Sequence, residues 1–200
     1  MKENLRVKPL HHSTGDWDID GDWGLDSAIY VSSPSSLYTY GIATALVKTT
    51  TVPISSVKEG RIDTYIRSNR VRQAAKIIFR YQDASNFYYA YFYWTPTAGT
   101  VTFEIHRVYG GADTTLQTGN VTGLNINEWI RIRVTWWNDY VGLVIRFEYW
   151  NGSAWVIGCN DAYDSNNYWK DVGGRVGLEL IYYEAGYKVW ADDTYIYGIG

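Results

Sequence analysis

The stretch from Glu128 to Gly158 constrains the fold more than any other part of the chain. It reads EWIRIRVTWWNDYVGLVIRFEYWNGSAWVIG, and apolar residues occupy every second position over two long runs. Alternation with a period of two is typical of a strand that buries one face. Asn138-Asp139 separates the first two runs, and Asn151-Gly152 follows the second. The pattern predicts a three-stranded antiparallel meander with a type I′ turn at Asn151-Gly152.

The apolar face of this meander requires a second layer to cover it. Its other face carries Arg, Glu and Trp. A sheet with one apolar face packs on another sheet or on helices. No helical periodicity of four turns occurs anywhere in the chain, whereas alternating runs recur along its length. We therefore predict an all-β fold, a two-sheet antiparallel jelly-roll β-sandwich of about eleven or twelve strands.

Three other segments carry specific expectations. Phe87–Trp94 (FYYAYFYW) is aromatic on both faces, which predicts a central strand that is covered on both sides. The parity of the alternation changes at Asp192-Asp193, and a β-bulge is the simplest cause. The polar stretch Asn160–Val172 is predicted to be a loop.

Length and charge narrow the class of protein. Two hundred residues suit one all-β domain, so we predict an N-terminal arm over residues 1–15 and a single sandwich over 16–200. The net charge of −3 and the absence of a basic run exclude non-specific nucleic-acid binding. The single cysteine, Cys159, is interpreted as a small buried side chain.

Two features that the sequence lacks bear on the location of the protein. No stretch approaches the ~20 apolar residues of a membrane span. The N-terminal residues have no apolar core of a signal peptide. We interpret the chain as an extracellular or virion-surface protein that needs no such signal, and a cytoplasmic location stays open.

An acidic segment near the N-terminus suggests calcium. Residues 16–26 read DWDIDGDWGLD, which matches the opening D-x-D-x-D-G of a calcium loop. Asp16, Asp18 and Asp20 are the candidate ligands. An EF-hand would need Glu where Ser27 stands, and no helical pattern flanks the loop. A structural Ca²⁺ is one hypothesis; the other is a polar edge strand whose acids face water.

The aromatic content, 17% of the chain with 19 Tyr and 10 Trp, suggests a binding surface. Sugars stack their apolar faces on aromatic rings, as nucleic-acid bases do. Tryptophans on outer strand faces and in loops would form such a platform, and nearby amides would bind hydroxyl groups. The predicted ligand-binding residues are Trp94, Trp137, Trp150, Trp155, Trp169, Asn138 and Asn167. The alternative for each tryptophan is burial under a loop or against another subunit.

Catalytic patterns are sparse. The chain contains no G-x-S-x-G, no H-E-x-x-H and no phosphate-binding loop. Glu104 and His106 in FEIHR share one face of a predicted strand. They fit either a surface pair or part of a catalytic set, and we predict no catalytic residue.

The order of several motifs resembles the concanavalin A-like lectin/glucanase superfamily. They are GDWDIDGDW near the start, IIFRYQDASNFYYAYF (77–92), FEIHRVYGG (103–111), EWIRIRV (128–134), GRVGLEL (174–180) and VWADDTYIYG (189–198). The resemblance implies two antiparallel sheets of five to seven strands, one of them concave, with the chain ends on neighbouring edge strands. It implies glycan ligands in the concave face or its rim loops, and structural calcium where a metal is present. Asp193 then joins the acids of the first strand as a candidate metal ligand.

The same resemblance bears on catalysis. The glucanase branch carries E-x-D-x-x-E on one strand, and this chain has no such triplet. The lyase branch needs an Arg/His/Tyr/Gln set, which residues from other strands would have to complete around His106.

The sequence thus predicts a non-catalytic, carbohydrate-binding surface-recognition domain in a larger extracellular or virion assembly. Its expected partners are a glycan or neighbouring protein subunits, including copies of itself in a homo-oligomer. The alternative is a polysaccharide-active enzyme of the same fold, a glycoside hydrolase or lyase.

Overall fold

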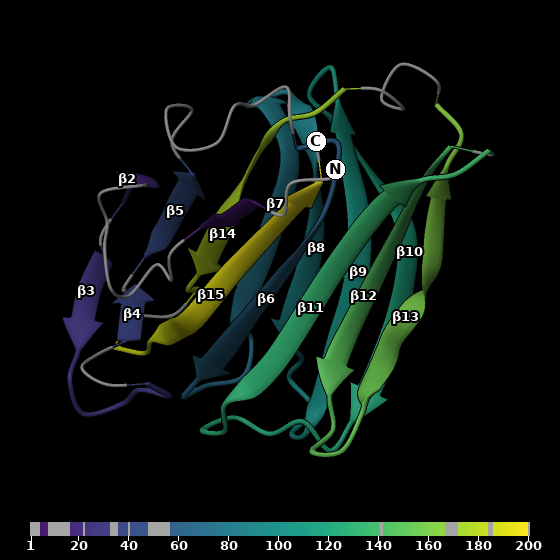
Figure 1. The fold of residues 1–200 in the computed structure, drawn as a ribbon. Helices are drawn as coiled ribbons and strands as arrows, with labels where there is room; N and C mark the ends of the chain where they lie inside the picture. The colour runs from purple at the N-terminus through teal and green to yellow at the C-terminus, as the bar shows by residue number, and fades with distance from the viewer. Residues whose placement is uncertain are drawn as a thin grey trace.

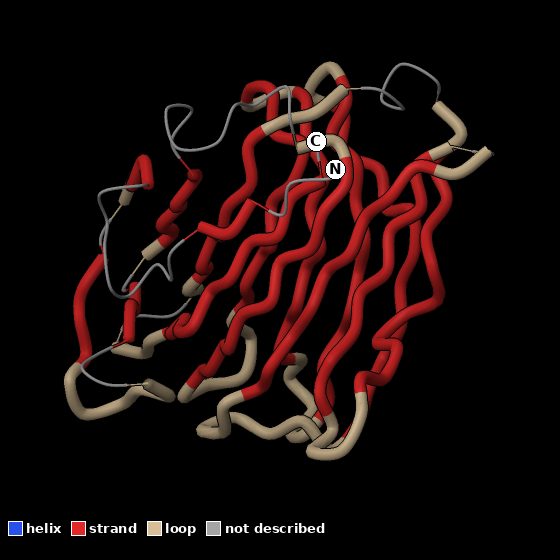
Figure 2. The backbone as a smooth tube through the Cα atoms, in the orientation of Figure 1, coloured by secondary structure: helices blue, strands red, loops and turns tan. Residues whose placement is uncertain are grey.

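Two antiparallel sheets packed face to face make up the described part of the chain (Figure 1). The computed structural model describes residues 5–7, 17–21, 23–32, 36–39, 41–47, 57–140, 142–166, 172–183 and 186–199. Within these ranges there are fifteen strands and no helix (Figure 2). The predicted all-β sandwich is confirmed, with more strands than expected because the N-terminal third contributes several short ones.

One sheet has eight strands and the other has seven. The eight-stranded sheet runs, in spatial order, β13 (Trp155–Asp164), β12 (Leu143–Trp150), β11 (Ile130–Asn138), β6 (Glu59–Ser68), β15 (Val189–Ile199), β4 (Ser36–Thr39) and β3 (Trp23–Asp26), and β1 (Leu5–Val7) also pairs with β15. The seven-stranded sheet runs β10 (Ala112–Thr122), β9 (Thr100–Tyr109), β8 (Asn86–Trp94), β7 (Ala74–Asp83), β14 (Arg175–Ile181), β5 (Ile42–Val47) and β2 (Trp17–Asp20). The larger sheet exceeds the five to seven strands that the resemblance implied.

The first and last described strands are neighbours. β1, which lies within the segment expected to be an arm, pairs with residues 196–198 of β15. β15 is not an edge strand, because its other side pairs with β6 along most of its length. The register between them shifts between Asp192 and Tyr195, and Asp193 has φ 45°, so the predicted bulge is confirmed.

The core lies between the two sheets and follows the alternation of the sequence. Ile130, Ile132, Val134 and Trp136 of β11 are all at most 4% exposed. The Trp136 ring stacks on Phe79 of β7, with ring centroids 4.8 Å apart, so the two sheets interlock through aromatic rings. Burying these faces is the main stabilising term of the sandwich.

β8 confirms the expectation of a strand that is covered on both faces. It lies third from one edge of the seven-stranded sheet. Tyr88, Ala90, Phe92 and Trp94 point into the core. On its other face, Tyr89 is only 5% exposed because aromatic neighbours pack around it.

Two local predictions were wrong. The meander is present, but the second hairpin has no type I′ turn: of the pair Asn151-Gly152 only Gly152 has positive φ. The Asn151 side-chain oxygen instead accepts the N–H groups of Ser153 and Ala154, which closes a longer loop. The loop predicted over residues 160–172 was placed too early in the chain. In the structure, β13 continues to Asp164 and pairs with the start of β12.

The reason for the second error is a break in the alternation. The β12–β13 register shifts on both sides of Phe147, opposite Cys159. A Cβ on Gly158 would lie 2.2 Å from the Phe103 ring, so only glycine allows the strand to approach the core here. In an irregular strand of this kind, inward and outward residues no longer alternate regularly. The alternation from which strands are predicted is then missing from the sequence.

Candidate functional site

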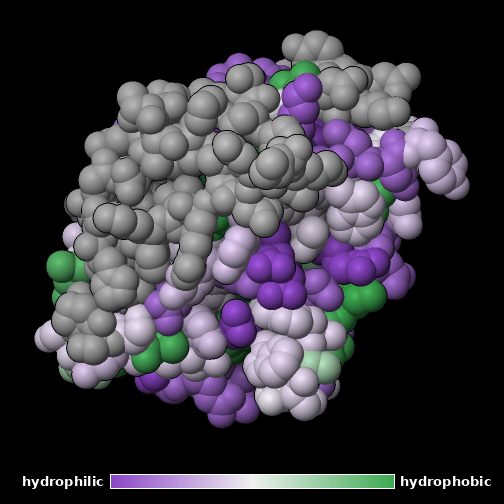
Figure 3. All heavy atoms as spheres, in the orientation of Figure 1, coloured by the Kyte–Doolittle hydropathy of each residue, from purple (hydrophilic) through white to green (hydrophobic). Residues whose placement is uncertain are grey.

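The outer surface of the eight-stranded sheet alternates arginines with aromatic rings. We call it the arginine–tryptophan face, and it spans β13, β12, β11, β6 and β15. Its side chains come from the outward positions of each strand, which the sequence pattern had assigned to solvent. Figure 3 shows hydrophilic side chains gathered over the middle of this face, with weakly polar residues between them.

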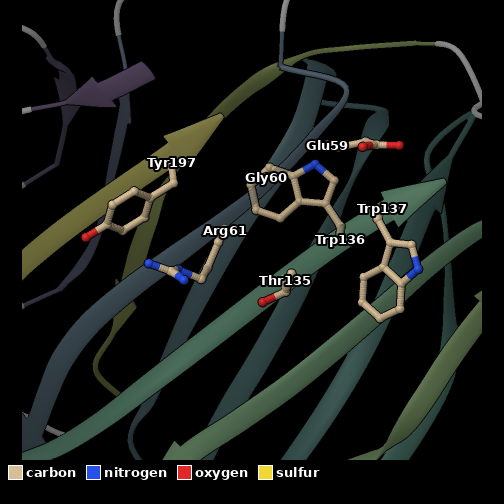
Figure 4. A pocket seen from close by; sticks show the side chains of 7 residues that line it. All are labelled: Glu59, Gly60, Arg61, Thr135, Trp136, Trp137 and Tyr197. Atoms are coloured by element: carbon tan, nitrogen blue, oxygen red, sulfur yellow. The ribbon is translucent and has the colours of Figure 1, made fainter. Parts of the chain in front are cut away.

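A cleft of about 500 Å³ opens on this face (Figure 4). Its lining residues are Glu59, Gly60, Arg61, Thr135, Trp136, Trp137 and Tyr197. Thr135 and Tyr197 are the two cross-strand partners of Arg61, so three strands place these side chains in one row. Tyr197 stands on one side and Trp137 on the other, with Arg61 and Thr135 between them.

Backbone geometry fixes the base of the cleft. Gly60 lies between Trp136 and Gly198 in the sheet. A Cβ on Gly60 would lie 2.6 Å from the carbonyl oxygen of Tyr197 and 2.7 Å from the Trp136 ring. Glycine is therefore required for this packing. The indole N–H of Trp136 is buried and has no hydrogen-bond partner among the described residues.

A buried carboxylate organises the arginines. Asp63 is 2% exposed and accepts two hydrogen bonds from Arg133, at 2.7 and 2.8 Å. Arg61 Nε and Arg131 Nη2 lie 3.3 and 3.7 Å from the same carboxylate. One anion thus serves three guanidinium groups, and the bidentate geometry with Arg133 holds the network rigid.

The guanidinium groups also stack on the rings. Arg61 lies 4.2 Å from the centroid of Tyr197, and Arg133 lies 3.8 Å from that of Trp155. Arg146 lies 5.5 Å from the centroid of Trp137. Cation–π contacts of this kind orient aromatic rings at a surface. The rings beside the cleft are therefore held in place before any ligand arrives.

Arg146 and Glu148 complete the charge pattern. Arg146 donates two hydrogen bonds to Asp161, and these bonds raise its pKa. Burial raises the pKa of the Glu148 carboxyl group, although Arg146 and Arg133 act in the opposite direction. A carboxyl group of raised pKa is what a general acid needs, but Glu148 does not line the cleft.

The outer surface of the seven-stranded sheet is of a different kind. We call it the tyrosine face: Phe87, Tyr89, Tyr91 and Tyr93 of β8, beside Glu104 and His106 of β9. The His106 ring stacks on Tyr89 at 4.5 Å. Its two nitrogens lie 2.9 Å from Glu104 and 3.0 Å from Asp113.

This geometry bears on the catalytic alternative. Both ring nitrogens of His106 already have protein partners: Glu104 lies at Nε2, and Asp113 lies at Nδ1 with the Thr115 hydroxyl 3.5 Å away. Within the described residues, Glu104 and His106 are therefore paired with each other on the surface of the sheet.

The predicted ligand-binding residues are placed in three ways. Trp137, Trp150 and Trp155 share the arginine–tryptophan face, and Trp150 and Trp155 meet across β12 and β13 at 5.6 Å. Trp155 begins a strand and does not lie in a loop. Trp150 is 36% exposed. Trp169 and Asn167 lie outside the described residues.

Two of the candidates face the interior. Trp94 was predicted to bind ligand, but it ends β8 at 1% exposure with its ring edge-on to Phe92. It cannot contact a ligand on the surface, because its position in the alternation points it into the core. The Asn138 side-chain oxygen accepts a hydrogen bond from the buried Arg80, and its backbone N–H donates to Glu59. Asn138 therefore positions a residue of the cleft from behind.

The predicted metal ligands do not come together. Asp18 and Asp20 lie on β2 of the seven-stranded sheet, whereas Asp193 lies on β15 of the other sheet. Asp18 forms an ion pair with Arg175. Asp16 lies outside the described residues. Within the described ranges, no three His, Cys, Asp or Glu side chains are grouped so that they could hold a metal.

The acids at the β15 bulge already have protein partners. One oxygen of Asp192 accepts the backbone N–H groups of Val31 and Ser32, and the other accepts that of Asp193. Asp193 accepts the hydroxyl of Ser32 at 2.8 Å. Both acids at this bulge are thus hydrogen-bonded to the segment at Val31 and Ser32.

Cys159 is buried, as interpreted from the sequence. It is 4% exposed, and burial raises the pKa of its thiol to about 12. A thiol of this kind is not a nucleophile.

Sequence reasoning missed Glu59, Arg61 and Tyr197 as site residues. The alternation assigned Arg61 to an outer face, but no signal in the sequence shows that β6 lies between β11 and β15. The cleft depends on that strand order, because its residues come from parts of the chain as far apart as Glu59 and Tyr197.

Solved structures of lectins and of a phage module share this fold. A seed lectin of Lotus tetragonolobus superposes with a TM-score of 0.63 at 10% identity, over 100% of this chain and 98% of the lectin. The CBM2 module of the evolved Dit of Lactobacillus casei BL23 phage J-1 gives 0.60 at 9% identity, over 99% and 97%. The exoplasmic/lumenal domain of VIP36, in its Ca²⁺/Man-bound form, gives 0.59 at 10% identity, over 92% and 89%.

The chain has the concanavalin A-like jelly-roll fold. The resemblance drawn from the motifs is thus confirmed at the level of fold, and identities near 10% carry it no further. No protein-family model matches the chain, and no curated protein sequence matches it. No helix among the described residues has the length and apolar character that spanning a membrane requires.

Proposed function

We propose that this protein binds carbohydrate, without catalysis, through the cleft between Trp137 and Tyr197. The cleft itself is the observation that carries the proposal. Its volume of about 500 Å³ lies within the range of small-ligand sites. Two aromatic walls suit the apolar faces of sugar rings, and a charged and hydroxylic floor suits their hydroxyl groups.

The floor offers both donors and acceptors. Arg61 donates, Glu59 accepts and Thr135 does both. A sugar hydroxyl also does both, so a mixed set of groups recognises it better than a set of one kind. The floor carries one positive and one negative side chain, which favours a neutral sugar over a charged one.

Trp150 and Trp155 extend the proposed surface away from the cleft. They lie on the same face and are farther from β6 than Trp137 is. A longer glycan would reach them, so we expect oligosaccharides to bind more tightly than monosaccharides.

The larger context is an extracellular or virion assembly. The similar structures named above are lectins and a carbohydrate-binding module of a phage protein. A sandwich with an aromatic outer face also suits packing against neighbouring subunits or copies of itself. Light scattering after size exclusion measures whether the isolated chain forms such an oligomer.

A glycan array followed by calorimetry tests the proposal. We expect one or more neutral glycans to bind, and Trp137→Ala and Tyr197→Ala each to weaken binding about tenfold or more. Tyr140→Ala is the matched control, because Tyr140 is an aromatic residue 94% exposed and outside the cleft. Binding that survives both cleft substitutions, or product release from a bound polysaccharide, would contradict the proposal.

A further inference from the structure

A second cavity lies on the tyrosine face. It has a volume of about 390 Å³ and is lined by Arg72, Tyr91, Tyr93 and Tyr183. We call it the Arg72 pocket. Tyr91 and Tyr93 are outward residues of β8, Tyr183 follows β14, and Arg72 lies in the bend between β6 and β7.

The Arg72 pocket is remote from the cleft. Arg61 is near the start of β6, whereas the bend that holds Arg72 follows its end at Ser68. Seven residues of extended strand span roughly 23 Å. The two cavities also belong to different sheets. A ligand in one of them therefore does not contact the other.

The arginine in this pocket has no acidic partner among the residues that the structure describes. No hydrogen bond or ion pair of the Arg72 side chain exists within the part of the chain that the structure describes. Two described acids of the face are engaged elsewhere: Glu179 lies 2.7 Å from Lys76, and Glu104 contacts His106. Arg72 thus brings to the cavity a positive charge that no described residue neutralises.

The backbone holds Arg72 in a strained conformation. Its φ is 62°, in the left-handed region that costs a non-glycine residue about 1 kcal/mol or more. Its N–H donates to the Trp94 carbonyl at 2.6 Å, and the Trp94 N–H donates to Gln73. A glycine would adopt this bend without strain, so the arginine side chain needs another reason to be there.

The tyrosines supply neutral donors. The Tyr91 and Tyr93 rings are nearly parallel, with centroids 5.9 Å apart. The hydroxyl groups of Tyr91 and Tyr183 share one hydrogen bond at 3.2 Å, which leaves one of their two protons free. Burial and this bond raise the pKa of Tyr91, so its hydroxyl stays protonated.

We infer that the Arg72 pocket binds a carboxylate-bearing sugar residue, a uronic acid unit of a glycan. A guanidinium group pairs bidentately with a carboxylate, and the tyrosine hydroxyls donate to its oxygens or to ring hydroxyls. Aromatic walls suit the sugar ring itself. This second site differs from the cleft in its ligand, because the cleft balances its charges and the Arg72 pocket does not.

Calorimetry with trigalacturonate tests the inference. The variant is Arg72→Gly, which removes the charge and relieves the strained φ, so it folds at least as stably as the wild type. We expect it to weaken trigalacturonate binding about tenfold or more. Tyr93→Phe, which removes only a hydroxyl, gives a smaller loss. Arg70→Gln removes the same charge from the same bend outside the pocket and leaves binding unchanged.

Two further sets of binding measurements identify the ligand and the site. The methyl ester of trigalacturonate and free acetate are each expected to bind at least tenfold more weakly than trigalacturonate. Trp137→Ala leaves trigalacturonate binding unchanged, while it weakens neutral-glycan binding at the cleft. Failure of the cleft proposal alone would thus leave the acidic ligand bound.

Several results would overturn the inference. They are no binding of trigalacturonate, equal losses in Arg72→Gly and Arg70→Gln, equal affinity for acetate or for the ester, and loss in Trp137→Ala but not in Arg72→Gly.

Discussion

The two outer faces of the sandwich use arginine in opposite ways. On the arginine–tryptophan face, Asp63 holds Arg61, Arg131 and Arg133, and their guanidinium groups stack on rings. On the tyrosine face, rings pack on each other, and Arg72 lies at one end with no acid beside it in the described part of the chain. Where the cations are neutralised within the protein, the surface is rigid and suits neutral ligands. Where an arginine has no acidic partner among the described residues, the surface favours a negatively charged ligand.

The largest expected difference between the faces is in stability. Asp63→Ala leaves three guanidinium groups around a buried position with no anion, and we expect a loss of about 3 kcal/mol in the free energy of unfolding. Glu179→Gln on the other face breaks the more exposed pair with Lys76 and should cost roughly 0.5 kcal/mol. Urea unfolding of both variants measures the difference. Equal losses would mean that Asp63 does not organise its face.

The shape of the cleft gives the next effect. Gly60→Ala places a methyl group 2.6 Å from the Tyr197 carbonyl oxygen, so β6 and β15 must move apart. We expect a loss of about 2 kcal/mol, with weaker neutral-glycan binding. Gly41→Ala is the matched control, because a Cβ there meets nothing within 4 Å and its φ is not positive. A Gly60→Ala protein as stable as that control would show that the packing at Gly60 tolerates a side chain.

Alternation in the sequence was enough to predict most strands and their inner faces. In β6, for example, Ile62, Thr64 and Ile66 occupy alternate positions, and each is fully buried. The strand order was not predictable, since it depends on pairing between distant residues. The same limit hid the cleft, which needs Tyr197 to lie beside Arg61.

Irregular positions explain the remaining errors. Trp94 was predicted to bind ligand, yet it lies at the end of its strand on the same face as Phe92, and this places it in the core. Arg80 is fully buried with φ 50°, where the pairing of β7 with β8 is interrupted. A buried arginine in the left-handed region cannot be predicted from polarity or period.

A smaller effect concerns pH on the arginine–tryptophan face. Burial raises the pKa of Glu148 in the folded protein. Such a group stabilises fully below its ordinary pKa, and that contribution is lost as pH rises through the folded value. Glu148→Gln removes this loss, so the stability of the variant relative to wild type should rise as the pH increases above the ordinary pKa of a glutamate, about 4.3.

Urea unfolding at several pH values measures the rise. If the stability of Glu148→Gln relative to wild type falls as the pH rises, Arg133 and Arg146 lower the pKa of Glu148 by more than burial raises it.

Calcium should have the smallest effect. Asp18 is paired with Arg175, and the oxygens of Asp192 and Asp193 accept protein donors. We expect the Tm in millimolar CaCl₂ and in EDTA to agree within about 1 °C. A clear rise with CaCl₂ and not with MgCl₂ would contradict this and would assign a calcium site to the chain.

The most direct test of binding at the cleft is the indole N–H region of the ¹⁵N NMR spectrum, recorded while a neutral glycan from the array is added. Single Trp→Phe variants assign the signals. We predict that the Trp137 signal shifts with saturation, while the Trp94 signal, from a ring buried in the core, stays in place. A saturable glycan that leaves Trp137 unmoved would contradict binding at the cleft.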